Sequence, residues 1–203
     1  FISMNALLEK GDHVVTTFPG YQSLYQVAED IGCQVSKWEP DQGLAFQVED
    51  LKALITDKTK LIVINFPHNP TGALISKDEL QGIVDMAREK DIVVFSDEMY
   101  RFMEYDEKDR LPSVCDLYEN AISLFGLSKT FGLPGLRMGW LTTRNKNFMQ
   151  ELVTFKDYTT ICNNAPGEKL GTIALQNKDK LIARSLGIIK GNLTLLEGFA
   201  HRH

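Results

Sequence analysis

Short apolar runs alternate with amphipathic segments along most of the chain. The apolar runs predict strands over residues 13–16, 34–38, 61–65, 92–96, 121–124 and 138–142. The amphipathic segments predict helices over 21–31, 48–55 and 76–90, and the pattern stays helical from residue 146 onward. Continuous apolar runs are typical of strands that are covered on both faces. Strands that alternate with helices predict an α/β fold with a largely parallel sheet.

Two of the predicted helices carry recognisable end signals. Ser76 and Glu79 have the spacing of a capping box at the start of the helix over 76–90. Gly32 closes the helix over 21–31, because glycine accepts the left-handed conformation that often ends a helix.

Composition and charge exclude several classes of protein. The 203 residues are 43% hydrophobic and 24% charged, which is enough for one sizeable core. The net charge of -5 leaves no basic stripe, so we expect no nucleic-acid partner. The three cysteines are far apart, which argues against disulfides and zinc and favours the reducing cytoplasm. No apolar run reaches the length of a membrane span, so we expect no membrane partner.

Both ends of the chain are apolar. Residues 1–8 resemble the middle of a buried helix, and Leu193, Leu195, Leu196 and Phe199 form an apolar stripe at the other end. We therefore expect the sequence to be a piece of a longer polypeptide.

Polar residues follow three of the predicted strands. Asn69 comes after the strand over 61–65, Asp97 and Tyr100 after that over 92–96, and Lys129 after that over 121–124. Ligands of open α/β sheets bind beyond the carboxyl ends of the strands. Each residue also has a structural explanation: Asn69-Pro70-Thr71-Gly72 is a good turn sequence, Asp97 is able to cap a turn, and a single lysine is usually solvated.

The order and spacing of the motifs point to a known family. The motifs are Pro19-Gly20-Tyr21, Asn69-Pro70-Thr71-Gly72, Asp97-Glu98-Met99-Tyr100 and the run from Ser128 to Trp140. Together they resemble those of pyridoxal-phosphate (PLP)-dependent fold-type I enzymes, particularly the class I/II aminotransferases, across nearly the whole chain. The resemblance implies a three-layer α/β/α arrangement with a mostly parallel mixed sheet. It also implies that residues 1–203 are an incomplete PLP-binding large domain, without the N-terminal arm, the phosphate loop and the C-terminal small domain.

The resemblance implies that four residues bind the cofactor ring. Asp97 would pair with the ring nitrogen, because a carboxylate favours its protonated form. Asn69 and Tyr100 would donate hydrogen bonds to the phenolic oxygen of the ring. Tyr21 would stack on the face of the ring.

The longest motif supplies the remaining cofactor ligands. Lys129 would form the Schiff base with PLP and would then move the proton of the substrate. Arg137 would bind the phosphate, since its guanidinium is always charged and binds in a bidentate manner. Many relatives carry a phosphate-binding serine where this chain has Gly126, so Ser128 or a backbone N–H would replace it.

Three functions are compatible with these motifs. An aminotransferase would exchange an amino group between an L-amino acid and a 2-oxo acid. Another PLP enzyme would instead catalyse β-elimination (a C–S lyase), decarboxylation or cyclisation, and a PLP-binding domain of a transcriptional regulator would only sense a metabolite. The resemblance further implies a homodimer.

Most of the other notable residues are expected to be structural. His68 is predicted to be a structural turn histidine, and the polar loop over 104–110 to be solvated. Asn163 or Asn164 would line the site, while Trp38 and Trp140 would pack in the core. No metal site is predicted, because His13, His201 and His203 lack ligand spacing.

Overall fold

The computed structural model describes residues 1–202, so His203 lies outside the described residues. The chain divides into two compact units. Unit 1 comprises Phe1–Glu98, Leu111–Phe125 and Leu141–Cys162. Unit 2 comprises Met99–Arg110, Gly126–Trp140 and Asn163–His203.

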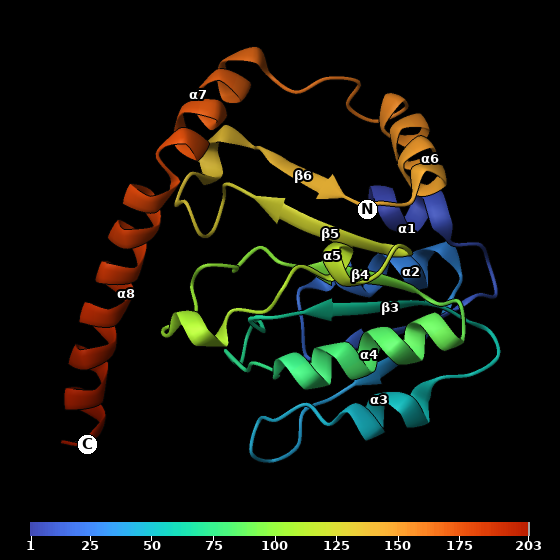
Figure 1. The fold of residues 1–203 in the computed structure, drawn as a ribbon, viewed down its shortest axis with the longest axis horizontal. Coiled ribbons are helices and arrows are strands. Elements are labelled where there is room, and N and C mark those ends of the chain that lie inside the picture. The colour runs from blue at the N-terminus through green and yellow to red at the C-terminus, as the bar shows by residue number, and fades with distance from the viewer. Residues whose placement is uncertain (203) are drawn as a thin grey trace. The chain divides into compact units, whose positions relative to one another are not determined.

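A six-stranded sheet has the order β2-β1-β3-β4-β5-β6. Its strands are β1 (His13–Thr17), β2 (Gln34–Trp38), β3 (Thr59–Asn65), β4 (Val93–Asp97), β5 (Ala121–Gly126) and β6 (Gly139–Thr142). All pairings from β2 to β5 are parallel. Strand β6 runs in the opposite direction (Figure 1), so the sheet is mixed. The predicted strands and the largely parallel sheet are confirmed.

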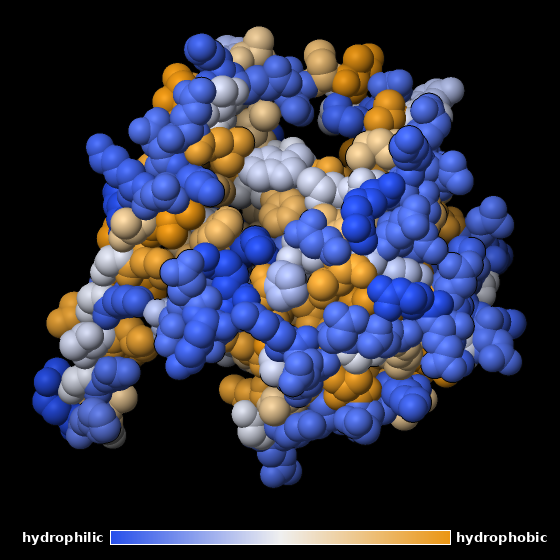
Figure 2. Space-filling model, in the orientation of Figure 1, coloured by the Kyte–Doolittle hydropathy of each residue, from blue (hydrophilic) through white to orange (hydrophobic). Residues whose placement is uncertain are grey.

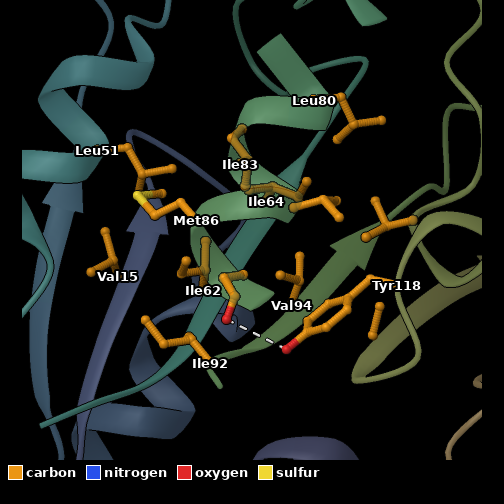
Figure 3. Packing of buried hydrophobic residues seen from close by; sticks show 14 of the residues in the cluster. Val15, Leu51, Ile62, Ile64, Leu80, Ile83, Met86, Ile92, Val94 and Tyr118 are labelled. Atoms are coloured by element: carbon orange, nitrogen blue, oxygen red, sulfur yellow. Dashed lines mark hydrogen bonds between the residues drawn. The ribbon is translucent and has the colours of Figure 1, made fainter. Parts of the chain in front are cut away.

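Helices cover both faces of the sheet in unit 1. On one face, α3 (Val48–Leu54), α4 (Lys77–Glu89) and α5 (Val114–Leu117) contribute to an apolar cluster (Figure 3). On the other face, α1 (Ile2–Leu7), α2 (Gln26–Ile31) and α6 (Lys146–Asp157) contribute to a second cluster. The three-layer α/β/α arrangement is therefore confirmed.

Strand β3 shows why the buried strands are apolar throughout. Ile62 and Ile64 belong to the first cluster, and Leu61 and Val63 to the second. All four side chains are at most 1% exposed. Because successive side chains of a strand point to opposite faces, a strand covered on both faces loses the alternation of polar and apolar residues.

The helix signals of the sequence are confirmed in detail. The Ser76 hydroxyl accepts a hydrogen bond from the Glu79 backbone N–H at 3.1 Å, and the Glu79 carboxylate accepts one from the Ser76 N–H at 2.6 Å. Gly32 ends α2 in the left-handed conformation, with a φ of 97°.

The predicted helix over 21–31 is wrong in its first half. A 3₁₀ turn (Gln22–Leu24) comes first, and α2 begins only at Gln26. Tyr25 interrupts the helix with φ −130° and ψ −42°. Its ring packs edge-on against Phe18 at a centroid distance of 5.6 Å, and Lys37 Nζ lies 4.1 Å from the centre of the Phe18 ring. We attribute the break to these contacts, which a helical pattern does not contain.

Unit 2 contains the two helices α7 (Ala165–Gln176) and α8 (Lys178–Ala200) and two 3₁₀ turns, Glu107–Asp109 and Pro134–Leu136. None of the described residues of α8 is buried, and Leu195 is 72% exposed. Figure 2 shows hydrophobic residues at the surface of this helix. Within residues 1–202, no helix is both long and apolar enough to cross a membrane.

The loop over 104–110 differs in part from the solvated loop that we predicted. Residues 105–109 are exposed, but Glu104 is buried and only 7% exposed. The buried carboxylate of Glu104 is paired with Arg110, whose Nε lies 3.5 Å away.

His13 is a buried histidine at the start of β1. Its Nδ1 lies 2.7 Å from the Thr59 hydroxyl, and its Nε2 lies 2.8 Å from the Ser36 hydroxyl. Burial lowers the pKa of His13. The unfolded chain therefore binds this proton more tightly than the folded protein does. Neutral His13 therefore makes its full contribution to the free energy of unfolding above the unfolded pKa of about 6.5. This contribution is lost as the pH falls below that value.

We expect His13→Gln to reduce the loss of unfolding free energy between about pH 8 and about pH 5.5. Urea unfolding at both pH values measures this loss. His201→Gln is the matched control, because His201 is exposed. An equal loss in wild type and His13→Gln would contradict the prediction.

Candidate functional site

Asn65 joins two of the predicted site residues at the carboxyl edge of the sheet. It is paired in register with Asp97 on the neighbouring strand. Its side-chain N–H donates to the Asp97 backbone carbonyl at 2.9 Å, and its side-chain oxygen accepts from the Asn69 backbone N–H at 2.9 Å. Sequence reasoning did not assign a role to Asn65. The sequence feature that could have identified Asn65 is an amide residue at the end of a continuous apolar run.

Asp97 is the last residue of β4 and is only 7% exposed. Strands β3 and β5 flank it on both sides, with Asn65 and Leu124 as its register partners. A carboxylate favours the protonated, cationic form of a neighbouring group. Asp97 is therefore chemically suited to a proton-bearing atom of a ligand.

Asn69 lies in a tight turn that His68 organises. The Gly72 N–H donates to the His68 carbonyl at 2.7 Å, and Gly72 has a φ of 74°, which favours glycine. His68 Nδ1 lies 2.7 Å from the Thr71 hydroxyl. Burial lowers the pKa of His68, although the nearby Pro19 carbonyl acts in the opposite direction. These contacts support a structural role for His68.

Tyr21 is the most exposed of the predicted ring ligands, at 61%. It directly precedes the 3₁₀ turn Gln22–Leu24. The contacts of Phe18 with Tyr25 and Lys37 anchor the chain on both sides of it. An exposed aromatic face on an anchored segment is suited to stack on a planar ligand.

Lys129 and Tyr100 lie side by side in unit 2. Lys129 Nζ lies 6.0 Å from the centre of the Tyr100 ring. The Lys129 side chain is exposed, and its carbonyl accepts from the Gly132 N–H at 2.9 Å in the turn that follows. The amine of Lys129 is therefore accessible to a ligand beside a phenol.

Ser128 and Arg137 flank the same turn. Ser128 is half-buried directly before Lys129. Arg137 has a left-handed backbone, with a φ of 54°, and its Nη1 donates to the Pro134 carbonyl at 3.0 Å. Its exposed guanidinium is suited to bind an anion.

Gly126 has no room for a side chain without a shift of its neighbours. A Cβ atom there would lie 3.0 Å from Sδ and Cε of Met99 and 3.2 Å from the Met138 carbonyl. In the family that this chain resembles, many members are expected to carry a serine at this position. Met99 fills the space that the serine side chain would take.

We expect Gly126→Ala to lower the unfolding free energy by about 1–3 kcal/mol, because overpacking forces Met99 or the Met138 backbone to move. Gly135→Ala is the matched control, since a Cβ at Gly135 would meet no described atom within 4 Å. Thermal unfolding compares the two. A Gly126→Ala melting temperature equal to that of Gly135→Ala would contradict the packing argument.

The site residues divide between the units. Tyr21, Asn69 and Asp97 belong to unit 1, and Tyr100, Ser128, Lys129 and Arg137 belong to unit 2. Unit 1 brings Asn69 and Asp97 together through Asn65. Unit 2 brings Lys129 and Tyr100 together directly.

The other residues considered from the sequence have structural partners. The side chain of Asn164 caps α7 by accepting from the Gly167 N–H at 2.6 Å, and it donates to the Leu136 carbonyl at 3.3 Å. Trp38 is 1% exposed and packs against Phe46.

Within residues 1–202, no group of three His, Cys, Asp or Glu side chains is arranged to hold a metal ion.

A cavity of about 590 Å³ in unit 1 lies at the other edge of the sheet. Its lining includes Lys60, Val93 and Asn120, which stand at the amino ends of β3, β4 and β5. The candidate site residues follow the carboxyl ends of these strands, so this cavity is not the candidate site.

Comparisons with known proteins agree on one family. Residues 2–193 match the family described as aminotransferase class I and II. The chain is 33% identical to the capreomycidine synthase of Streptomyces vinaceus over 86% of its own length and 45% of that protein. It is 29% identical to an aspartate aminotransferase of Sulfolobus acidocaldarius, over 88% of this chain and 46% of the relative. The chain thus spans about half the length of these relatives.

A solved structure is similar over the whole chain. It is a PLP-dependent aminotransferase from Streptococcus suis, with a TM-score of 0.93 and 33% identity. The match covers 100% of this chain and 54% of that structure. With the matched family and the three-layer fold, these similarities show that the chain belongs to the class I and II aminotransferase family.

Proposed function

We propose that the full-length protein is a PLP-dependent aminotransferase that exchanges an amino group between an L-amino acid and a 2-oxo acid. The observation that carries the proposal is the exposed amine of Lys129, 6.0 Å from the centre of the Tyr100 ring, in a chain of this family. Residues 1–203 form the incomplete PLP-binding large domain, which agrees with a chain that spans about half the length of its relatives.

The donor set fits PLP. The cofactor has a ring nitrogen, a phenolic oxygen, an aldehyde carbon and a phosphate. Asp97 offers a buried carboxylate at a strand end. Tyr100 offers a phenol hydroxyl for the phenolic oxygen, Lys129 offers an amine, and Arg137 offers an exposed guanidinium. Each polar group of the cofactor therefore has a residue of matching chemistry in this chain.

Each residue has a defined task toward the bound cofactor. When bound, PLP supplies an electron sink for the substrate Cα. Asp97 would hold the proton on the ring nitrogen, and Asn69 and Tyr100 would donate hydrogen bonds to the phenolic oxygen. Tyr21 would stack on the ring. The charge of Asp97 would favour the cationic form of the ring nitrogen.

Three further residues would complete the set that holds the cofactor. Arg137 would bind its phosphate through charge-assisted hydrogen bonds, and Ser128 would add a hydroxyl donor. The amine of Lys129 would hold the cofactor and would take the proton from the substrate Cα.

The half-reaction tests the proposed activity. The full-length protein is loaded with PLP and mixed with single L-amino acids, without any 2-oxo acid. With the correct amino acid, we expect loss of the absorbance band of the lysine-bound cofactor and a stoichiometric yield of the 2-oxo acid. Persistence of the band with every amino acid would contradict transamination. It would favour another PLP reaction, such as that of a C–S lyase, or a sensor domain of a transcriptional regulator.

A second candidate rests on one relative. The similar protein from Streptomyces vinaceus is named a synthase rather than an aminotransferase. Another PLP reaction, such as cyclisation, decarboxylation or C–S β-elimination, is therefore the alternative. Turnover of an amino acid without any acceptor 2-oxo acid distinguishes this candidate, because transamination stops after one half-reaction.

We also propose that the protein is a cytoplasmic homodimer with small-molecule substrates. The net charge of -5 and the separated cysteines support the location and the lack of a nucleic-acid partner. The family resemblance supports the dimer. Light scattering of the full-length protein measures the oligomeric state.

A further inference from the structure

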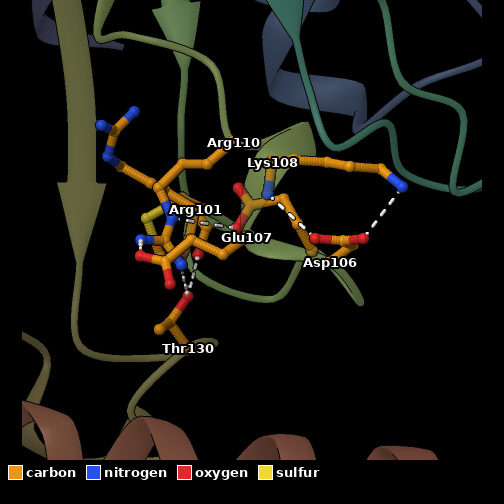
Figure 4. A network of polar contacts seen from close by, with 8 residues as sticks. Arg101, Asp106, Glu107, Lys108, Arg110 and Thr130 are labelled. Atoms are coloured by element: carbon orange, nitrogen blue, oxygen red, sulfur yellow. Dashed lines mark hydrogen bonds and ion pairs between the residues drawn. The ribbon is translucent and has the colours of Figure 1, made fainter.

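Thr130 directly follows Lys129 and is 2% exposed. Its hydroxyl lies 2.7 Å from the Arg101 carbonyl and 3.1 Å from the Met99 carbonyl (Figure 4). A threonine hydroxyl has a single hydrogen to donate, so the two carbonyls share it. These carbonyls belong to the residues on either side of Tyr100. One side chain therefore connects the residue after Lys129 with both neighbours of Tyr100.

The segment around Tyr100 depends on such connections. It forms a turn and not a strand, with the Met103 N–H donating to the Tyr100 carbonyl at 3.0 Å. Phe102 has a φ of 74°, in the left-handed region that is unfavourable for a side chain of its size. A turn of this kind needs contacts from outside to keep one geometry.

Two arginines contact the ring of Phe102 in the same turn. The guanidinium carbons of Arg110 and Arg101 lie 4.7 Å and 5.4 Å from the centre of the Phe102 ring. Arg110 also binds Glu107 at 2.9 Å. None of these contacts involves Lys129. The hydroxyl of Thr130 links the turn to the lysine segment through the backbone, in addition to the contact of Lys129 Nζ with the Tyr100 ring.

We infer that Thr130 is a positioning residue that sets the place of Lys129 Nζ relative to the Tyr100 phenol. The inference rests on the proposed function, in which Lys129 binds PLP and Tyr100 donates to its phenolic oxygen. Loss of the hydroxyl leaves the Met99 and Arg101 carbonyls without this donor and frees the turn to move. Misplacement of a reacting amine by about 1 Å lowers the rate by as much as about a hundredfold.

The test compares Thr130→Val with Thr130→Ser in the full-length protein. Valine keeps the shape of threonine without the hydroxyl, and serine keeps the hydroxyl without the methyl group. We expect Thr130→Val to lower kcat about tenfold to a hundredfold with a KM change of less than about threefold. It also shifts the pH midpoint of the absorbance change of the lysine-bound cofactor. Thr130→Ser retains both values within about twofold.

Thr17→Val is the matched control. Thr17 is 1% exposed, and its hydroxyl has no hydrogen-bond partner within residues 1–202. The same substitution there removes a buried hydroxyl without a lost bond, so kcat and the pH midpoint remain as in wild type. If Thr130→Val does not fold, Thr130→Ala is measured in its place with the same expectation.

The outcomes separate this inference from the proposed function. A wild-type band with unchanged kcat and pH midpoint in Thr130→Val overturns the role of Thr130 alone. Equal damage in Thr130→Ser and Thr130→Val also overturns it, because packing of the methyl group then explains the effect. Absence of any lysine-dependent band in wild type removes both the proposed function and the positioning role.

Discussion

We expect replacement of Lys129 by alanine in the full-length protein to lower amino-group transfer by about 10⁴-fold or more. Under the proposed function, the variant would lose both the covalent bond to PLP and the amine that takes the proton from the substrate. It would also lose the absorbance band of the lysine-bound cofactor. The fold is retained, because the Lys129 side chain is exposed and its backbone carbonyl still accepts from the Gly132 N–H. Steady-state rates and the visible spectrum measure both losses.

Lys146→Ala is the matched control for this prediction. Lys146 is an exposed lysine at the start of α6 and is not among the site residues. Its rate and spectrum are expected to equal those of wild type. A Lys129→Ala protein that keeps the band, or a rate within about tenfold of wild type, would contradict the assignment.

We expect replacement of Asp97 by asparagine to lower kcat by about 10²- to 10³-fold, or about 3–4 kcal/mol of transition-state stabilisation. Asparagine has the shape of aspartate but lacks the charge that, under the proposed function, holds the proton on the ring nitrogen. The backbone contact is unaffected, since Asn65 donates to the Asp97 main-chain carbonyl. The band of the lysine-bound cofactor therefore persists, and only the reaction slows.

Asp116→Asn serves as the control, because Asp116 is an exposed carboxylate on α5. Asp97→Glu adds a second comparison, since it keeps the charge and changes its position. Partial activity in Asp97→Glu, above that of Asp97→Asn, supports an electrostatic role. A kcat for Asp97→Asn within about twofold of wild type would contradict that role.

The sequence predicted the elements whose signals are local. Each predicted strand of the sheet exists, and the continuous apolar runs of β3 and β4 form strands that are buried on both faces. The capping box of Ser76 and Glu79 also appears as expected, since its partners are three residues apart. The family motifs supplied the proposed cofactor ligands in the same way.

Contacts between distant segments could not be predicted from the sequence. The break at Tyr25 depends on Phe18 and on Lys37 of another strand. Glu104 is buried and paired with Arg110, within a loop whose composition predicts exposure. Periodicity describes a residue and its neighbours in sequence, so it does not report such pairs.

The site shows the same limit. The sequence indicated no role for Asn65, a single amide residue at a strand end. In the structure, its side chain binds the backbone of both Asn69 and Asp97. The glycine at position 126 is explained only by the structure, in which a Cβ atom there would lie 3.0 Å from Sδ and Cε of Met99. Motifs identify groups with suitable chemistry, whereas three-dimensional contacts identify the residues that position them.

Chemical trapping of the cofactor tests the central claim most directly. The full-length protein is incubated with PLP, reduced with borohydride to fix any Schiff base, digested and analysed by mass spectrometry. We predict a phosphopyridoxyl group on the peptide that contains Lys129, and none at that peptide in Lys129→Ala. A modification confined to other lysines, or no modification at all, would contradict the claim that Lys129 binds PLP.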